Sequence, residues 1–112
     1  MNTPQKSDEH RISLETAVAM TSRLRSQDQK RLPISETFDR TAFDRLLAQP
    51  GCAALRIYYG MDEAMQTRAI IVGVDEKNED ILPTPENPAG EIVDISKLCP
   101  PFCAPASPLN PG

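Results

Sequence analysis

The chain has 112 residues, of which 39% are apolar and 25% are charged, a composition typical of one globular domain. Its net charge is −4, and residues 75–112 hold seven acidic residues against two lysines. Because nucleic-acid phosphates would repel this acidic segment, we do not expect a nucleic-acid partner. No stretch approaches the roughly 20 apolar residues of a membrane span, so no membrane partner is expected either.

Aromatic residues are scarce, with no tryptophan, two tyrosines and three phenylalanines. A core made mainly of aliphatic side chains in so short a chain is expected to be small. Small cores commonly gain stability from a second subunit, a metal or a disulfide. A homodimer is therefore expected.

The N-terminal residues 1–11 are polar and are expected to form a mobile leader. They lack the apolar segment of a signal peptide, so we expect a cytoplasmic protein. The cysteine count is three, and an odd number fits reduced thiols better than a framework of disulfides.

Two helices are predicted in the first half of the chain. The first follows Ser13, a good N-cap, and runs over about residues 14–26 with apolar residues at helical spacing. Cations near its end complement the helix dipole, and the basic cluster there comprises Arg23, Arg25, Lys30 and Arg31.

The second predicted helix has a clearer start. Asp39 fits the N-cap, and Phe38 and Phe43 have the spacing of a hydrophobic staple across the first turn. The sequence Gln49-Pro50-Gly51 ends this helix and turns the chain.

Three strands are predicted next. Residues 52–59 alternate as a strand does, residues 67–74 are almost wholly apolar, and a tight turn at 75–78 leads to a third strand at 80–82. The predicted fold class is α+β, with two N-terminal helices packed on a small antiparallel β-meander in a domain of residues 12–82.

The middle strand is apolar on both faces. Ile70, Val72 and Val74 should project to one face, and Ala69 and Ile71 to the other. Two helices can cover only one face of a three-stranded sheet. We therefore expect either the C-terminal segment or a second subunit to cover the other face, and we favour the second subunit.

The composition changes at Pro83, since eight of the eleven prolines lie between Pro83 and Pro111. Residues 83–112 are expected to form an extended, polyproline-like acidic tail, with one regular element near residues 92–98. If this tail covers the sheet, it must do so with its few apolar side chains, which are Ile92, Ile95, Leu98 and Phe102.

The segment Cys99-Pro100-Pro101-Phe102-Cys103 is the most unusual in the chain. Polyproline geometry would place the two cysteine Cα atoms about 12 Å apart, beyond the ~7 Å limit for a disulfide. A structural segment with free thiols is therefore favoured, with a disulfide or thiol switch and a metal site as alternatives. A zinc site at Cys99 and Cys103 would need further ligands, for which Cys52 and His10 are the remaining soft donors.

Enzyme chemistry has little support in the sequence. His10 is the only histidine and lies in the expected leader, which disfavours any nucleophile–histidine mechanism. The acidic run at residues 75–80 lacks the spacing of a calcium loop, and the isolated glycines form no phosphate loop. We expect no enzyme and no cofactor.

The chain contains QPGCAALRIYYG at residues 49–60, VGVD at residues 72–75, and CPPFC followed by SPLN between residues 99 and 110. Together these segments resemble a group of small uncharacterised bacterial proteins that pair such a strand hairpin with a Cys-Pro tail. The resemblance covers roughly residues 35–110. It implies a shared fold and no known activity, cofactor or partner.

The leading hypothesis is a non-enzymatic protein-interaction module that binds another protein or itself. Its predicted interaction residues are Ile70, Val72, Val74 and Phe102. The alternative hypothesis is a thiol redox or metal-binding protein that uses Cys99 and Cys103.

Overall fold

The computed structural model describes residues 10–27, 32–94 and 96–111. The chain forms two compact units. One comprises Met1–Gln29 with Ala104–Gly112, and the other comprises Lys30–Cys103. Residues 1–9 of the expected leader, Lys30 and Arg31 of the basic cluster, and Ile95 lie outside the described residues.

The first unit contains helix α1 (Leu14–Arg25), close to the bounds predicted for it. Ser13 caps the helix, because its Oγ accepts a hydrogen bond from the Thr16 N–H at 3.0 Å. Arg25 Nη1 donates to the Leu109 carbonyl oxygen at 3.0 Å and links the helix to the C-terminal segment of the same unit. None of the twelve helical residues is buried.

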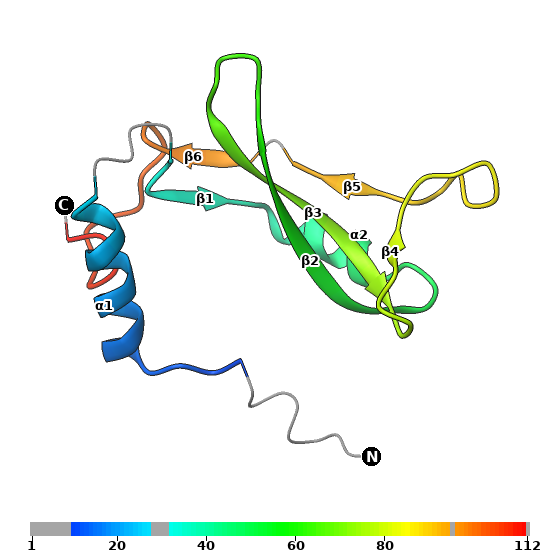
Figure 1. The fold of residues 1–112 in the computed structure, drawn as a ribbon, viewed down its shortest axis with the longest axis horizontal. Coiled ribbons are helices and arrows are strands. Elements are labelled where there is room, and N and C mark those ends of the chain that lie inside the picture. Colours follow the sequence, from blue (N-terminus) through cyan, green and yellow to red (C-terminus); the bar gives the residue numbers. More distant parts are fainter. Residues whose placement is uncertain (1–9, 28–31, 95, 112) are drawn as a thin grey trace. The chain divides into compact units, whose positions relative to one another are not determined.

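The second unit is built on an antiparallel sheet with β3 (Thr67–Asp75) at its centre. Strand β2 (Cys52–Met61) pairs with one edge of β3, as the long green hairpin in Figure 1 shows. The other edge of β3 pairs with two short strands, β4 (Asp80–Ile81) and β5 (Ile92–Val93). The predicted antiparallel meander is confirmed, and β5 is added to it.

Helix α2 (Arg40–Leu47) covers one face of this sheet and forms the core with it. The core centres on Leu46, Ile71 and Val93, with the phenylalanine rings of the helix start packed against them. These two rings, Phe38 and Phe43, stack with centroids 5.5 Å apart, which confirms the staple. Asp39 occupies the N-cap position, although its side chain accepts no capping hydrogen bond.

A second, two-stranded sheet was not predicted. Strand β1 (Ser35–Thr37) precedes α2 and pairs antiparallel with β6 (Lys97–Cys99), and Figure 1 shows the two strands side by side. The expectation of two N-terminal helices followed by a meander is therefore wrong in its order of elements. Three-residue strands are too short to show a period of two, and this pair joins segments far apart in the sequence.

The segment after Pro83 also differs from the expected extended tail. It supplies β5 and β6, and the second unit continues to Cys103. Two compact turns within it are each closed by a pair of backbone hydrogen bonds of 2.9–3.1 Å, between Thr84 and Asn87 and between Ser107 and Asn110. Its prolines therefore bound short strands and turns rather than one continuous polyproline segment.

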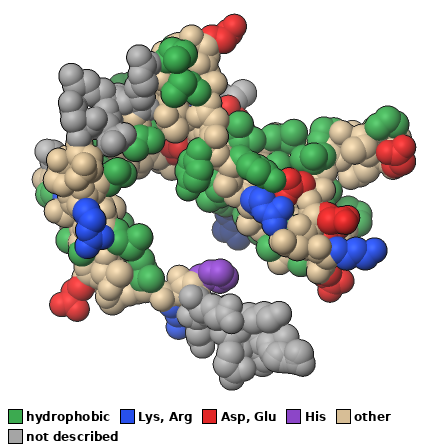
Figure 2. Space-filling view, viewed as in Figure 1, with side chains coloured by type: hydrophobic (Ala, Val, Ile, Leu, Met, Phe, Trp, Pro, Cys, Tyr) green, Lys and Arg blue, Asp and Glu red, His purple; other side chains and the backbone are tan. Residues whose placement is uncertain are grey.

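The described helices include none with the length and apolar character needed to cross a bilayer. Apolar side chains nevertheless reach the surface of the molecule beside charged ones, as the space-filling view shows (Figure 2).

The position of Leu46 in the core gives a first prediction. Leu46 is 0% exposed, whereas its neighbour Leu47 is 52% exposed. Leu46→Ala should lower the free energy of unfolding by about 2–5 kcal/mol, because it removes buried methyl groups and leaves a cavity. Leu47→Ala is the matched control and should cost less than about 1 kcal/mol. Urea denaturation measures both, and equal costs would contradict this description of the core.

Candidate functional site

Two of the predicted interaction residues are buried within the chain. Val72 is 2% exposed and Val74 is 3% exposed, while Ile70 is half-buried and Phe102 is exposed. Val72 lies opposite Arg56 on β2, and Val74 lies opposite Asp80 on β4. Residues that are directly opposite share a face of the sheet. Arg56 and Asp80 therefore lie on the same face as the two valines.

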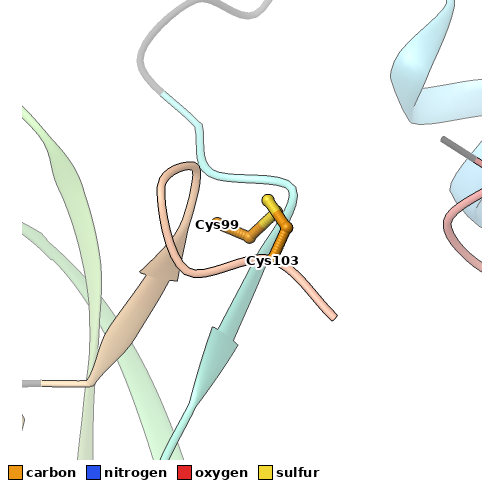
Figure 3. Close-up of a disulfide and its surroundings, with 2 residues drawn as sticks. All are labelled: Cys99 and Cys103. Carbon is orange, nitrogen blue, oxygen red and sulfur yellow. A yellow bond between two sulfur atoms is a disulfide. The ribbon is translucent and has the colours of Figure 1, made fainter. Parts of the chain in front are cut away.

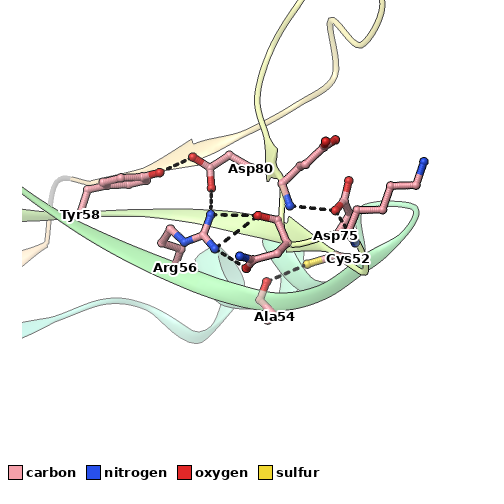
Figure 4. Close-up of polar contacts among 9 residues, drawn as sticks. Cys52, Ala54, Arg56, Tyr58, Asp75 and Asp80 are labelled. Carbon is pink, nitrogen blue, oxygen red and sulfur yellow. Dashed lines mark hydrogen bonds and ion pairs between the residues drawn. The ribbon is translucent and has the colours of Figure 1, made fainter.

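A polar bridge crosses β3 on this face. Arg56 Nη1 forms an ion pair with Asp80 Oδ1, and Tyr58 Oη donates a hydrogen bond to Asp80 Oδ2 (Figure 4). Because β2 and β4 flank β3, a contact between their side chains must pass over the central strand. The stem of Arg56 can cover apolar surface while its guanidinium pairs with the carboxylate.

Val72 and Val74 are thus buried within one chain, and the C-terminal segment contributes to this face through Ile92 of β5, which lies opposite Val72. Asn78, in the turn before β4, accepts from Arg56 Nη2 through its side-chain oxygen and completes the network. Arg56 and Asp80 were not predicted to meet. The register across the turn at residues 75–79, which places Asp80 opposite Val74, was the signal that could have found them.

The bridge also shifts the acidity of its members. The hydrogen bond from Tyr58, followed by the contact with Arg56, holds the pKa of Asp80 below its usual value. The same hydrogen bond to Asp80, together with desolvation, raises the pKa of Tyr58.

The outer edge of β2 has no partner strand in the part of the chain that the structure describes. We call it the β2 edge and define it as the regular stretch 54–61, beyond the irregularity between Cys52 and Ala54. Four apolar side chains on it are substantially exposed, namely Ile57 (50%), Tyr58 (46%), Tyr59 (78%) and Met61 (51%). The stretch contains one charged residue, Arg56, and no proline. Exposed strands of this length are usually protected by lysine, proline or bulges.

The structure joins Cys99 and Cys103 in a disulfide, with Cα atoms 4.6 Å apart (Figure 3). The favoured expectation of free thiols on an extended segment therefore does not describe this structure. The segment forms a tight turn instead, with the peptide bonds before both prolines cis and the Phe102 N–H donating to the Leu98 carbonyl oxygen at 2.8 Å. Cys99 is fully buried and Cys103 is exposed.

The other predicted soft donors lie elsewhere. Cys52 is the free cysteine among the described residues, is half-buried, and donates through Sγ to the Ala54 carbonyl oxygen at 3.3 Å. His10 is exposed in the first unit. Within residues 10–27, 32–94 and 96–111, no group of three histidine, cysteine or acidic side chains could hold a metal ion.

Glu36 on β1 makes polar contacts with β3 and with Ser96 that the sequence did not predict. Its two carboxylate oxygens each lie 3.1 Å from the Ala69 N–H, and Oε1 also accepts from the Ser96 hydroxyl at 2.7 Å. The carboxylate therefore caps a backbone donor of β3 and ties β1 to the main sheet. No periodic pattern in a three-residue strand could have indicated this.

An open pocket of about 430 Å³ lies beside β4. Its two acidic side chains are already engaged, because Asp80 pairs with Arg56, and Asp75 Oδ1 accepts from the N–H groups of Lys77 and Glu79. The remaining lining residues are Pro50, Gly51, Ile81, Leu82, Thr84 and Asn87. Both acidic side chains of the pocket are therefore engaged in contacts within the chain.

The pKa of Asp80 gives a second prediction. Because the folded-state pKa is lowered, the stabilisation is fully present above the unfolded value of about 3.9 and is lost as the pH falls through the folded value. Asp80→Asn should therefore be less stable than the wild type at pH 7 and should lose less stability between pH 5 and pH 3.

Urea unfolding at several pH values tests this, with Glu79→Gln as the control at an exposed neighbouring carboxylate. The control should keep the wild-type pH dependence. An Asp80→Asn protein with an unchanged pH dependence would show that the bridge does not stabilise the folded state.

Comparison with known proteins finds no matching family model, no matching curated protein and no matching solved structure. The resemblance to small bacterial proteins remains an expectation.

Proposed function

We propose that the chain is a non-enzymatic protein-interaction module whose binding element is the β2 edge. The observation that carries the proposal is the outer edge of β2, open in the described part of the chain, with Ile57, Tyr59 and Met61 at least half exposed. An extended strand of a partner can add to such an edge, with backbone hydrogen bonds giving affinity and alternate side chains giving specificity.

Two further observations favour binding over catalysis. Val72 and Val74 are buried and support the fold, so we assign the interaction to the β2 edge instead of these valines. The acidic side chains nearest the pocket are held in structural contacts. The partner we propose is a protein, either another chain or a second copy, in the cytoplasm, and neither nucleic acid nor a membrane.

A photo-crosslinking amino acid at position 59 tests the proposal in the cells that make the protein. Tyr59 is the most exposed side chain of the β2 edge, so illumination should give a discrete crosslinked product that mass spectrometry can identify. The same amino acid at position 86, an exposed site outside the sheet, should give none. If position 59 also gives none, the β2 edge is not a binding element.

A second candidate function is thiol–disulfide exchange, which the observed disulfide favours. A partner dithiol would attack the sulfur of Cys103, the exposed residue of the pair, form a mixed disulfide there and release the Cys99 thiolate. The second thiol of the partner would then break the mixed disulfide, leaving two protein thiols and one oxidised partner. Two electrons pass from the dithiol to the Cys99–Cys103 pair, and this role requires Cys103 to be the reactive member.

The unequal burial of the two cysteines predicts unequal reactivity. In a Cys99→Ser protein the remaining Cys103 should react with a thiol reagent roughly tenfold faster than Cys99 does in a Cys103→Ser protein, because buried thiols are inert. Mass spectrometry of timed alkylation measures both rates, with Cys52→Ser included in each to remove the third thiol. Equal rates would remove the support for an exchange site.

A further inference from the structure

We propose that the β2 edge pairs antiparallel with the β2 edge of a second copy, with Tyr58 at the two-fold axis, so that two sheets become one. This inference rests on the proposed function and names its partner. It follows from three properties of the β2 edge: the direction of its backbone groups, the extent of its regular stretch, and the positions of its charges.

The direction of the backbone groups follows from the pairing of β2 with β3. The Asp62 N–H donates to the Gln66 carbonyl oxygen at 3.0 Å, and Met61 lies opposite Thr67 in the same register. Hydrogen-bonded and non-hydrogen-bonded pairs alternate along an antiparallel ladder. The even-numbered residues of β2 therefore bond to β3, and the N–H and C=O groups of four odd-numbered residues point outward: Leu55, Ile57, Tyr59 and Met61.

Glu36 confirms this assignment independently. Ala69 lies opposite Tyr59, and its N–H points away from β2, since it donates to the Glu36 carboxylate. The pair formed by Tyr59 and Ala69 is thus a non-hydrogen-bonded one. Tyr59 must direct its own N–H and C=O away from β3, toward the β2 edge.

A two-fold antiparallel pair of β2 edges must match outward residues with outward residues, which leaves few registers. With Arg56 at the axis, two guanidinium groups would lie directly opposite each other, an unfavourable arrangement. With Ile57 at the axis, Met61 would lie opposite Ala53, within the irregular part of the strand. Neither register uses the whole regular stretch.

Placing Tyr58 at the axis removes both problems. Ile57 then lies opposite Tyr59 of the second copy, and Leu55 lies opposite Met61 of the second copy. All four outward residues find backbone partners, and the exposed side chains of Ile57, Tyr59 and Met61 gain apolar neighbours across the new ladder. Aromatic and aliphatic pairs across strands are favourable.

Charges in this register do not oppose one another. Arg56 lies opposite Gly60 of the second copy, so it faces no charged side chain directly. Its diagonal neighbour is Asp62 of the second copy, an opposite charge that is paired with Arg68 of its own chain, just as Arg56 is paired with Asp80. The two Arg56 side chains lie apart, on either side of the central tyrosine pair. The edge is therefore self-complementary in hydrogen bonding and places no like charges opposite each other.

The oligomeric state of the purified full chain tests the proposal. Light scattering at micromolar to 100 µM concentrations should show a dimer. Ile57→Lys should raise the dimer dissociation constant at least tenfold, because edge lysines oppose strand addition. Ile92→Lys is the matched control: Ile92 is 51% exposed, against 50% for Ile57, but lies on β5, on the far side of β3. This control should remain dimeric.

Disulfide trapping tests the register and does not depend on how Ile57→Lys folds. In a Cys52→Ser background, Ile57→Cys and Tyr59→Cys proteins are mixed and oxidised. Opposite hydrogen-bonded residues have Cα atoms about 5.5 Å apart, within disulfide range, whereas diagonal residues are about 7–8 Å apart. The mixture should therefore crosslink between the two variants faster than either variant crosslinks with itself.

The outcomes separate this inference from the proposed function. A monomeric full chain that still crosslinks from position 59 to a different protein overturns the self-pairing and keeps the interaction module. A monomeric chain with no such crosslink overturns both. A dimer that Ile57→Lys and Ile92→Lys weaken equally, or that traps no disulfide between positions 57 and 59, also overturns the β2 pairing.

Discussion

The central strand β3, apolar on both faces, is the constraint around which the second unit is arranged. On one face Ile71 packs against Leu46 of α2. On the other face Val72 and Val74 are buried, the ion pair between Arg56 and Asp80 spans the strand, and Ile92 of β5 lies opposite Val72. Both faces of the central strand are therefore buried within one chain.

Local signals in the sequence predicted the elements well. Ser13 starts α1, the stacked pair of Phe38 and Phe43 marks the start of α2, and the apolar run at residues 67–74 is the central strand. Each of these signals lies within a few residues of the structure that it determines. That closeness explains why the two helices and the β2–β3 hairpin could be predicted.

Contacts between distant segments could not be predicted in the same way. The pairing of β1 with β6 and the cap that Glu36 places on Ala69 join residues more than thirty positions apart, and neither leaves a local pattern. The disulfide was disfavoured because proline suggested an extended backbone, whereas the segment turns. Val72 and Val74 were predicted to bind a partner because they are apolar, but in this fold their side chains are buried in the interior.

The cap formed by Glu36 has a consequence for how far assembly can proceed. On the edge of β3 that faces away from β2, the Glu36 carboxylate accepts from the Ala69 N–H. Strand β5 pairs with Ile71 and Val72 on this edge, and β4 pairs with Gly73 and Val74. The outer edges of β4 and β5 are only two residues long, which is too short for another strand to pair with them. Once β2 is paired, no long margin of the main sheet is left in the described chain. Growth would then stop at two copies, which separates a closed pair from an open-ended fibre.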